Sequence, residues 1–340
     1  MKLFIYEHIT SGALIDESLP ASLAREGDNM LMAIVQDLVQ LATIELIILR
    51  DARLEALTDL SDNGTVHIVT IDNSTRFERA YLDAINQADM VLPIAPETEG
   101  VLTEIQQQVL NSQTRLLASH PVATQITSDK YLCHQQLIAH GIHSPTTIKA
   151  CEWPLKHFHS PSGFIIKPID GAGCIDTFFI ADSPSLEAWL ESHDSGLDKM
   201  IIQAYIDGEP MSISLLADSN DSLILAINRQ KIQFNNTQLT FVGSIVNGVD
   251  EADLSVTQAA EIVAKVHQAI VGLWGFIGID IIVQNNTLFV LDINPRLTSS
   301  YSGLRQSLNH NPAQLLFTMM EHGLSALPAS LQRQAVEVKV

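Results

Sequence analysis

The stretch IGIDIIVQNNTLFVLDINPR, residues 277–296, decides the fold that this sequence predicts. It contains two runs rich in apolar and β-branched residues, 277–283 and 287–293, which are typical of strands. Asn285 and Asn286 stand between the runs, and asparagine tolerates the positive φ angles of a tight turn. The stretch therefore predicts a β-hairpin of two antiparallel strands.

Three oxygen-bearing side chains converge in this hairpin. Asp280 and Asp292 fall on neighbouring strands, and Asn294 follows Asp292 by two positions, so that the side chains of the latter two share one face. Carboxylate and amide oxygens are ligands that Mg²⁺ prefers, usually together with substrate phosphates. The three residues therefore predict a magnesium site, with Mn²⁺ as the alternative ion. The competing interpretation is a lone acid at a strand end followed by an ordinary turn.

An arginine, Arg296, follows Asn294 by two positions at the end of the same hairpin. Its planar guanidinium suits two-point binding of a phosphate or a carboxylate. From spacing alone, a surface ion pair would account for Arg296 equally well.

Two lysines belong to sequences that suit phosphate binding. Lys167 ends the apolar strand expected at 164–167, and the glycine-rich turn DGAGC follows at 170–174. Backbone N–H groups of such a turn can cradle phosphate oxygens, although an ordinary hairpin turn has the same pattern. Lys130 lies in the first turn of a helix that we expect Ser128 to cap, where a cation is mildly unfavourable and therefore suggests a specific role.

The sequence MIIQAYIDGE at 200–209 combines an apolar strand with a glycine turn. Backbone amides in such a hinge can read the edge of an adenine, and Glu209 could accept the hydroxyls of a ribose. An ordinary strand and turn is the competing interpretation.

The first 118 residues alternate strands and helices, which is typical of a parallel sheet covered on both faces. The expected strands are 3–6, 44–49, 90–95 and 115–118, and the expected helices are one capped by Asp28, 77–88 and 99–111. No G-x-G-x-x-G follows the first strand, which argues against a dinucleotide-binding oxidoreductase.

The rest of the chain mixes short strands with a few helices, which predicts an α+β arrangement. After the helix from Ser128 to His140, the expected strands are 164–167, 177–180, 200–205, 212–217, 223–227 and 239–245. The expected helices are 184–191, 256–273 and 312–322.

Composition argues against several classes of function. The 39 acidic residues against 19 basic residues give a net charge of −20, which repels nucleic acid and anionic lipid, so we expect neither as a partner. The longest apolar stretch, 269–279, is too short to span a membrane, and the apolar start at 1–6 is too short for a signal peptide. Three cysteines without a C-x-x-C pair argue against disulfides and a zinc site, and they favour a reducing compartment.

Taken in their order along the chain, these motifs resemble the ATP-grasp superfamily of carboxylate–amine ligases. The resemblance rests on SDK at 128–130, IIKP at 165–168, DGAG at 170–173, QAYIDGE at 203–209, GID at 278–280 and DINPR at 292–296. Three further segments are most similar to the tyramine–glutamate ligases of methanofuran synthesis and related chains of methylotrophic bacteria: YEHITSG at 6–12, PETEG at 96–100 and NPRLTSSY at 294–301.

This resemblance implies a fold and a cellular setting. A parallel α/β pre-grasp domain, 1–118, would precede two α+β subdomains, 119–205 and 206–340, that enclose ATP. The resemblance also implies a cytoplasmic enzyme that acts on a small-molecule carboxylate and a small-molecule amine, and it allows a homodimer.

The same resemblance implies roles for single residues. Lys130 and Lys167 would contact the nucleotide phosphates, and Lys167 and Arg296 would be the catalytic cations beside the transferring phosphoryl group. The other residues implied are Gly171, Ala172 and Gly173 for the phosphates, Gln203, Ala204, Tyr205 and Ile206 for the adenine, Glu209 for the ribose, and Asp280, Asp292 and Asn294 for the metal.

The sequence departs from the family pattern at three positions. Gln203 stands where many relatives carry Glu, and Cys174 stands where a further Gly is common. Glu209 is offset by one position against some family members.

The chemistry implied is the ATP-driven joining of a carboxylate to an amine. The carboxylate would attack the γ-phosphate, form an acyl phosphate and then react with the amine, releasing ADP and phosphate. We expect glutamate as the carboxylate and tyramine or tyrosine as the amine, held by Glu7, His8, Ser11, Ser299, Ser300 and Tyr301. The alternatives are ordinary loop polarity for these residues, a bicarbonate or nucleotide-precursor substrate, and a non-catalytic nucleotide-binding module.

Overall fold

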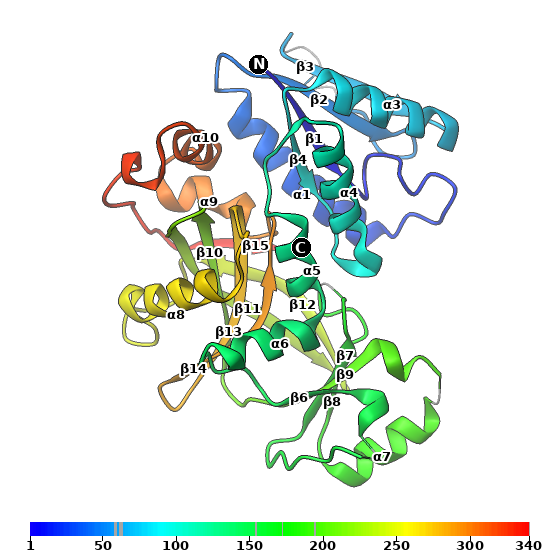
Figure 1. Cartoon of the computed structure of the whole chain (residues 1–340), viewed down its shortest axis with the longest axis vertical. Helices are drawn as coiled ribbons and strands as arrows, with labels where there is room; N and C mark the ends of the chain where they lie inside the picture. The colour runs from blue at the N-terminus through cyan, green and yellow to red at the C-terminus, as the bar shows by residue number, and fades with distance from the viewer. Residues whose placement is uncertain (58–59, 61–63, 154, 172, 194, 340) are drawn as a thin grey trace.

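The computed structural model describes residues 1–57, 60, 64–153, 155–171, 173–193 and 195–339. The described residues form a five-stranded sheet in the N-terminal third of the chain and a ten-stranded sheet in the rest (Figure 1). Each sheet packs against helices, so the mixed α/β fold class expected from the sequence is confirmed. The expected domain boundaries at 118/119 and 205/206 stay predictions.

The N-terminal sheet is parallel throughout, with strand order β3-β2-β1-β4-β5. Its strands are β1 (Lys2–Glu7), β2 (Glu45–Asp51), β3 (Val66–Ile71), β4 (Met90–Ile94) and β5 (Arg115–Leu116), and its helices are α1 (Ala21–Leu38), α3 (Ser74–Gln87) and α4 (Val101–Asn111). Side chains of β1 alternate: Leu3 and Ile5 pack with α1, while Phe4 and Tyr6 pack with α3 and α4. The prediction of a sheet covered on both faces is therefore confirmed, although β3 was not foreseen.

Helix α1 begins seven residues before the predicted cap at Asp28. Pro20 precedes its first turn and provides no side-chain cap. The segment 21–27 is rich in good helix formers, so the helix extends toward the N-terminus. Asp28 lies within the helix and pairs with Arg50 of β2 instead. The expected cap was wrong because an ion pair to the sheet satisfies this carboxylate.

The predicted cap at Ser128 was also wrong. Ser128 is the last residue of α5 (Pro121–Ser128), a helix that the sequence did not predict, and its hydroxyl donates to the carbonyl of Thr124 at 2.7 Å. Asp129 caps α6 (Lys130–Ala139) by accepting from the backbone N–H groups of its first turn. Because a short carboxylate in extended backbone is a strong N-cap, the chain turns at Asp129 and Lys130 becomes the first helical residue.

The larger sheet has the order β14-β13-β10-β11-β12-β8-β7-β9-β6, and β15 pairs with β12. Its strands are β6 (Thr147–Lys149), β7 (Phe164–Pro168), β8 (Phe178–Ile180), β9 (Met200–Ala204), β10 (Glu209–Ala217), β11 (Ser222–Asn235), β12 (Gln238–Val246), β13 (Gly275–Gln284), β14 (Thr287–Asn294) and β15 (Val336–Lys339). The predicted hairpin is β13–β14, and Asn285 and Asn286 in its turn have φ angles of 48° and 64°. β11 continues eight residues beyond the expected strand.

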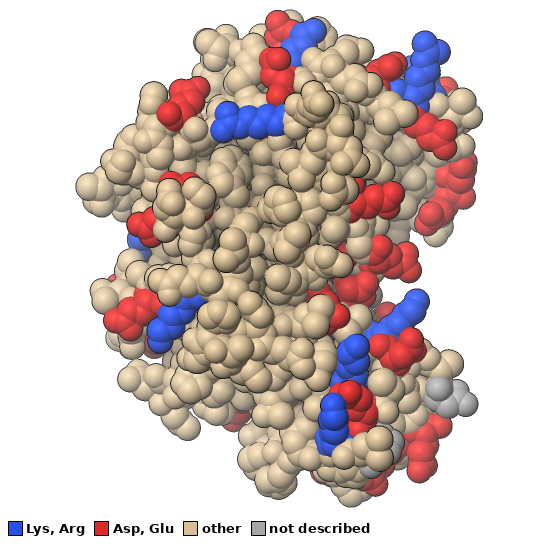
Figure 2. Space-filling view, in the orientation of Figure 1, with Lys and Arg blue, Asp and Glu red and all other residues tan. Residues whose placement is uncertain are grey.

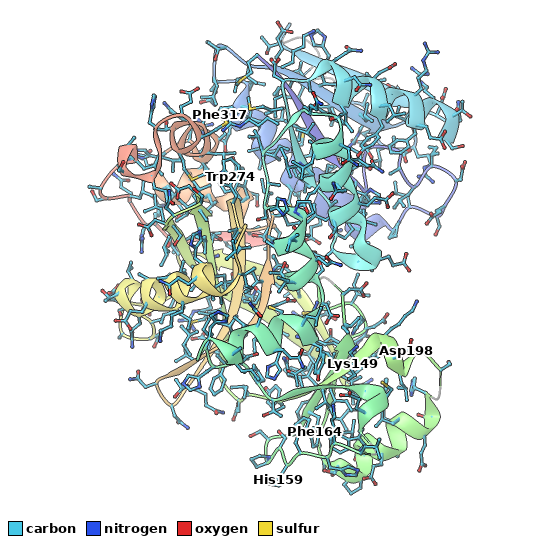
Figure 3. The ribbon with its side chains drawn as sticks, viewed as in Figure 1. Lys149, His159, Phe164, Asp198, Trp274 and Phe317 are labelled. Carbon is cyan, nitrogen blue, oxygen red and sulfur yellow. The ribbon has the colours of Figure 1, made fainter. Side chains whose placement is uncertain are left out.

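Two lobes of this sheet enclose separate apolar cores. In the lower lobe of Figure 1, α7 (Ser183–Ser192) covers a core that includes Phe164 and Ile202. In the other lobe, α8 (Val256–Ala269) covers β10, β13 and β14. Figure 3 labels Phe164 in the first lobe. It labels Trp274 and Phe317 at the end of the second lobe that lies farther from the first. A single register pair, Gln238 with Phe178, joins β12 to β8 between the lobes.

The C-terminal helices α9 (Tyr301–Leu308) and α10 (Pro312–His322) pack against α1 of the N-terminal domain. Asp37 near the end of α1 is 2 % exposed, and it accepts hydrogen bonds from Tyr301 Oη and Arg305 Nη1, both at 2.7 Å. α9 was not foreseen, whereas α10 has the predicted bounds. This polar contact therefore joins α1 of the N-terminal domain to α9.

Replacing Asp37 with Ala is expected to lower the unfolding free energy by about 1–3 kcal/mol, because the buried Tyr301 hydroxyl loses its acceptor. Urea unfolding followed by fluorescence measures this loss. The matched control is Asp37→Asn, which keeps an acceptor oxygen and should lose less. Unfolding of Asp37→Ala at the wild-type urea concentration would contradict the role given to this contact.

The surface fits the acidic composition. On the face shown in Figure 2, most Lys and Arg side chains lie beside acidic ones, including a small group at the lower right. Within the described part of the chain, no helix is both long enough and apolar enough to cross a membrane.

Candidate active site

A cavity of about 230 Å³ lies between the two lobes of the larger sheet. One wall is formed by β7 and β9, and the opposite wall is formed by β10, β11, β13 and β14. The residues expected to bind ATP, metal or substrate that line it are Lys130, Lys167, Gly171, Gly173, Gln203, Ala204, Tyr205, Ile206, Asp280, Asp292, Asn294, Arg296, Ser299 and Ser300. Ala172 lies outside the described residues. Motifs spread over more than 170 residues therefore meet in one cavity.

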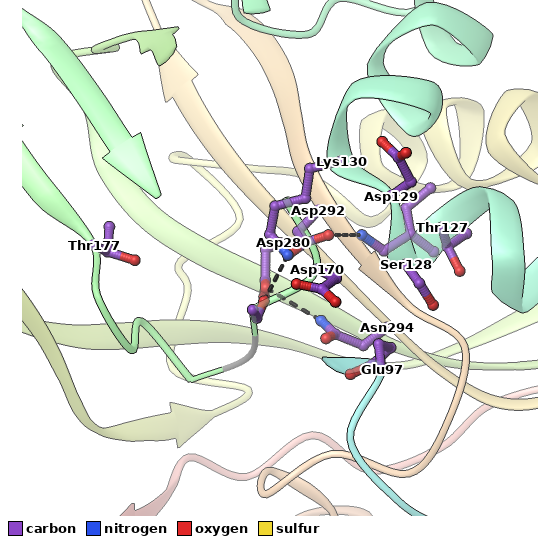
Figure 4. A network of polar contacts seen from close by, with 12 residues as sticks. Glu97, Thr127, Ser128, Asp129, Lys130, Asp170, Thr177, Asp280, Asp292 and Asn294 are labelled. Carbon is purple, nitrogen blue, oxygen red and sulfur yellow. Dashed lines mark hydrogen bonds and ion pairs between the residues drawn. The ribbon is translucent and has the colours of Figure 1, made fainter. Parts of the chain in front are cut away.

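The hairpin brings its three oxygen-bearing side chains together, as predicted. Asp280 and Asp292 are direct register partners on β13 and β14, and Asn294 lies opposite Gly278. Asp280 accepts from Asn294 Nδ2 at 3.2 Å and from Gln230 Nε2 of β11 at 2.8 Å (Figure 4). A Cβ at position 278 would lie 2.8 Å from Thr298, so glycine there leaves room for the chain that follows the hairpin.

Electrostatics at the hairpin favour a bound cation. Burial, reinforced by the charge of Asp292, raises the pKa of Asp280 to about 6. Two carboxylates forced together out of water repel each other unless a positive charge lies between or beside them. Two carboxylates and an amide also form the oxygen donor set that suits a hard divalent cation. The residues present therefore fit a magnesium ion.

Two buried lysines stand beside this carboxylate pair. Lys130 Nζ lies 3.2 Å from Asp292 Oδ2 and donates to the carbonyl of Gly171 at 2.6 Å. Burial disfavours the charge of Lys130, but the charge and hydrogen bond of Asp292 outweigh burial and raise its pKa. Burial lowers the pKa of Lys167. The N-cap at Asp129 thus positions Lys130, and the end of β7 positions Lys167.

The glycine loop contacts Lys130 through the carbonyl of Gly171. Gly173 has a φ angle of 65° with open space around it, and Cys174 has a φ angle of 60°, which is uncommon for a residue with a side chain. Cys174 lines the cavity, and burial raises the pKa of its thiol to about 11. The Cys174 side chain is therefore a protonated thiol at neutral pH and not a nucleophile.

The hinge residues line the cavity, as the sequence suggested, except for Glu209. Gln203 is buried and donates to Thr147 Oγ1 at 3.0 Å. Pro210 and Ser212 of β10 line the cavity, and because strand side chains alternate, Glu209 points to the other face. There it pairs with Arg229. The structure therefore does not bring Glu209 to the cavity.

Arg296 forms a two-point ion pair with a residue of the N-terminal domain. Its Nε and Nη2 lie 2.8 and 2.9 Å from the two carboxylate oxygens of Glu97, which is 6 % exposed. The alternative of a surface ion pair is therefore wrong, since this pair is buried beside the cavity. Glu97 follows β4, and ligand-binding residues of parallel sheets commonly lie just beyond the carboxyl ends of strands. That signal was present in the sequence, although no role was assigned to Glu97.

Four of the six residues expected to hold substrate do not line the cavity. Glu7 accepts from the backbone and hydroxyl of Thr10, both at 2.6 Å, so its carboxylate closes its own loop. His8 contacts Tyr6 Oη, and the Ser11 hydroxyl donates to the carbonyl of His8. Tyr301 is the fourth of these residues, and its hydroxyl donates to Asp37 in the contact between α9 and α1. A different residue of the N-terminal domain, Glu26 of α1, lines the cavity instead.

Comparison with known families agrees with this geometry. A family model described as the ATP-grasp domain matches residues 127–300, which is more than half of the chain. The chain belongs to the ATP-grasp family. A model described as the pre ATP-grasp 3 domain matches residues 44–124 of the same ATP-grasp protein.

Individual relatives of this ATP-grasp protein are carbon–nitrogen ligases, and it is an enzyme of that class. The tyramine–L-glutamate ligase of Methanocaldococcus fervens is 25 % identical over 305 residues, covering 89 % of each chain. That of Methanocaldococcus jannaschii is 24 % identical over 316 residues, covering 92 % of this chain and 87 % of the relative. The chain thus resembles a carboxylate–amine ligase over most of its length.

Solved structures share the ATP-grasp fold. An ATP-grasp superfamily protein from Archaeoglobus fulgidus superposes with a TM-score of 0.69 at 23 % identity, covering 93 % of this chain and 88 % of that one. The L-amino acid ligase from Bacillus licheniformis has a TM-score of 0.64 at 14 % identity, covering 94 % and 73 %. In this ATP-grasp enzyme the cavity lies between the two lobes of the larger sheet.

Proposed function

We propose that this enzyme activates a carboxylate of glutamate as an acyl phosphate and couples it to a primary aromatic amine such as tyramine. The observation that carries the proposal is the meeting of three cations, Lys130, Lys167 and Arg296, with the paired carboxylates of the hairpin in one cavity. The named substrates rest on the two tyramine–L-glutamate ligases that match most of the chain. A place in the synthesis of a methanofuran-type cofactor is part of the same proposal.

ATP would lie along the cavity from the hinge to the hairpin. Gln203, Ala204, Tyr205 and Ile206 would hold the adenine at one end, and Ile165 and Ile282 add apolar surface to the lining. Lys130 and Lys167 would contact the phosphates at the other end. Lys130 donates to the carbonyl of Gly171, so the glycine loop lies at the same end of the cavity. Closure of Gly171 and Gly173 over the phosphates would exclude water from a reactive intermediate.

Asp280, Asp292 and Asn294 would hold magnesium. Among the described residues no three His, Cys, Asp or Glu side chains form a metal site by themselves, so ATP phosphates would complete the shell. When bound, the ion would neutralise charge on the phosphate oxygens.

The chain's own residues would overcome the repulsion between two anions. The substrate carboxylate must approach the γ-phosphate, and Lys167 and Arg296 would stabilise the negative charge that gathers there. Attack gives an acyl phosphate and ADP, and the amine then displaces phosphate to form the amide. Most of the rate would come from positioning, so no nucleophile of the protein is needed. Ser299 and Ser300 line the cavity beside Arg296 and can orient the substrates.

The test is ADP release by the purified protein with ATP, Mg²⁺, glutamate and a panel of amines that includes tyramine and tyrosine. We expect ADP release to depend on both substrates and the product mass to equal glutamate plus amine minus water. Reactions that omit glutamate or the amine are the controls. ADP release with bicarbonate in place of glutamate, or no stimulation by any amine, would overturn the substrate assignment.

A further inference from the structure

Glu26 lines the cavity but has no part in the proposed binding of ATP, magnesium or the carboxylate. It lies on α1, is partly buried, and is the only cavity-lining residue contributed by the described part of the first 118 residues. Its neighbour Gly27 packs against β1 so closely that a Cβ there would lie 2.7 Å from the carboxylate of Glu7. This close packing fixes the first half of α1 against the sheet. Glu26 is therefore held at the cavity by a rigid element and not by a loose loop.

The other charged groups of the cavity have partners or a task. Lys130 pairs with Asp292, Arg296 pairs with Glu97, and Asp280 accepts two hydrogen bonds. Burial lowers the pKa of Lys167, the charge of Asp292 opposes that shift, and its task is at the nucleotide phosphates. Glu26, by contrast, has no hydrogen bond or ion pair to any described residue, although it senses the charge of Arg296. A partly buried carboxylate without a partner is costly unless a cation arrives with the substrate.

We propose that Glu26 binds the ammonium group of the incoming amine and accepts one of its protons. The proposal rests on the proposed function, because it presumes a ligase with an amine substrate. An amine is protonated near neutral pH and cannot attack a carbonyl until it loses a proton. The side chain that takes this proton must line the cavity.

Elimination leaves Glu26 for this task. The other titratable side chains of the described cavity wall are three cations, the two carboxylates of the hairpin, a thiol and a phenol, and no histidine is among them. The carboxylates of the hairpin are assigned to magnesium, and the three cations are assigned to the phosphates and the transferring phosphoryl group. Burial raises the pKa of Glu26, against the opposing charge of Arg296, which makes its carboxylate a better proton acceptor than an exposed one.

The step balances in protons and charge. One ammonium proton passes to a carboxylate oxygen of Glu26, and the freed lone pair of the nitrogen forms the C–N bond at the acyl carbon. The C–O bond to phosphate breaks, and its electron pair leaves on the phosphate. A second proton leaves the nitrogen with that phosphate. Glu26 then releases its proton to water and is ready for another cycle.

The experiment compares two nucleophiles in the full-length Glu26→Gln variant. Hydroxylamine is uncharged at neutral pH, so it traps the acyl phosphate as a hydroxamate without an ammonium-binding carboxylate. We expect Glu26→Gln to lower kcat/KM for tyramine by about 10²-fold or more while hydroxamate formation from glutamate is retained. The matched control is Glu78→Gln, an exposed Glu of α3, which should change neither reaction.

Other results would overturn the proposal. Equal loss of amide and hydroxamate formation would show that Glu26 serves the carboxylate substrate, and no loss of either would remove it from the reaction. If the wild-type enzyme forms no hydroxamate with glutamate, the proposed function fails separately, and calorimetric binding of tyramine to the enzyme with an ATP analogue then decides. Binding weakened about tenfold in Glu26→Gln supports the proposal, whereas unchanged binding overturns it.

Discussion

Replacing Asp292 with Asn is expected to lower ligase turnover about 10²–10³-fold while the protein stays folded. Asp292 faces Asp280 across the hairpin and holds Lys130 at 3.2 Å, so one change weakens both the proposed magnesium site and the position of a cation. The amide is nearly the same size as the carboxylate, and β13 and β14 keep their register. The loss should therefore appear in catalysis rather than in folding.

ADP release and Mn²⁺ binding followed by electron paramagnetic resonance measure this effect. The control is Asp83→Asn on α3, whose side chain is 58 % exposed and does not line the cavity. Circular dichroism should show the same secondary structure for all three proteins. Wild-type turnover by Asp292→Asn would mean that the hairpin does not hold the ion used in the reaction.

Replacing Arg296 is expected to reduce both turnover and stability. Arg296→Lys keeps the charge but loses the planar fork that contacts both oxygens of Glu97, and we expect kcat to fall about 10²–10³-fold. Arg296→Met removes the charge as well and leaves the buried Glu97 unpaired. That should lower the unfolding free energy by about 3–5 kcal/mol.

A double variant separates the two effects. Glu97→Gln combined with Arg296→Met removes the stranded charge, so urea unfolding should show most of the stability regained while turnover stays low. The control for the arginine change is Arg76→Lys, an exposed position on α3. Arg296→Lys with unchanged kcat would refute the catalytic role of Arg296. A double variant no more stable than Arg296→Met would refute the account of the ion pair.

The N-terminal domain contacts the active site at more than one point. Besides the pair of Glu97 with Arg296, the backbone N–H of Glu99 donates to Asp170 Oδ2 at 2.8 Å, and the Thr98 hydroxyl donates to the carbonyl of Asp170 at 3.3 Å. Asp170 begins the glycine loop. The segment after β4 therefore touches both the loop that would cover the phosphates and the arginine beside them.

The sequence predicted those helices and strands whose ends and turns are set by neighbouring residues. Helix α10 has the expected bounds because Asn311 caps it, Pro312 opens it and Gly323 follows its end. The β13–β14 hairpin formed as expected because its two asparagines adopt positive φ angles. In both cases neighbouring residues supply the hydrogen bonds and the turn geometry, so a short window contains the information.

Other predictions failed because the side chains have partners that the sequence patterns did not show, some distant in the chain and some within the same loop. Asp28 looked like a helix cap, but Arg50 of another strand binds it. Glu7, His8 and Ser11 looked like substrate ligands, but their loop satisfies its own hydrogen bonds. The short strands β6 and β15 have too few residues for a periodic pattern and exist because longer strands offer them free edges.

The sequence by itself determined the family, the hairpin with its two carboxylates, and the order of the phosphate-binding motifs. Each single motif, and the hairpin above all, depends on residues close together in the chain, where strand alternation and turn geometry dictate which side chains share a face. Only the tertiary structure decided that Glu26 reaches the cavity and that Glu97 holds Arg296, 199 residues away. Contacts over such separations arise from the packing of whole helices and sheets, and no spacing in the chain records them.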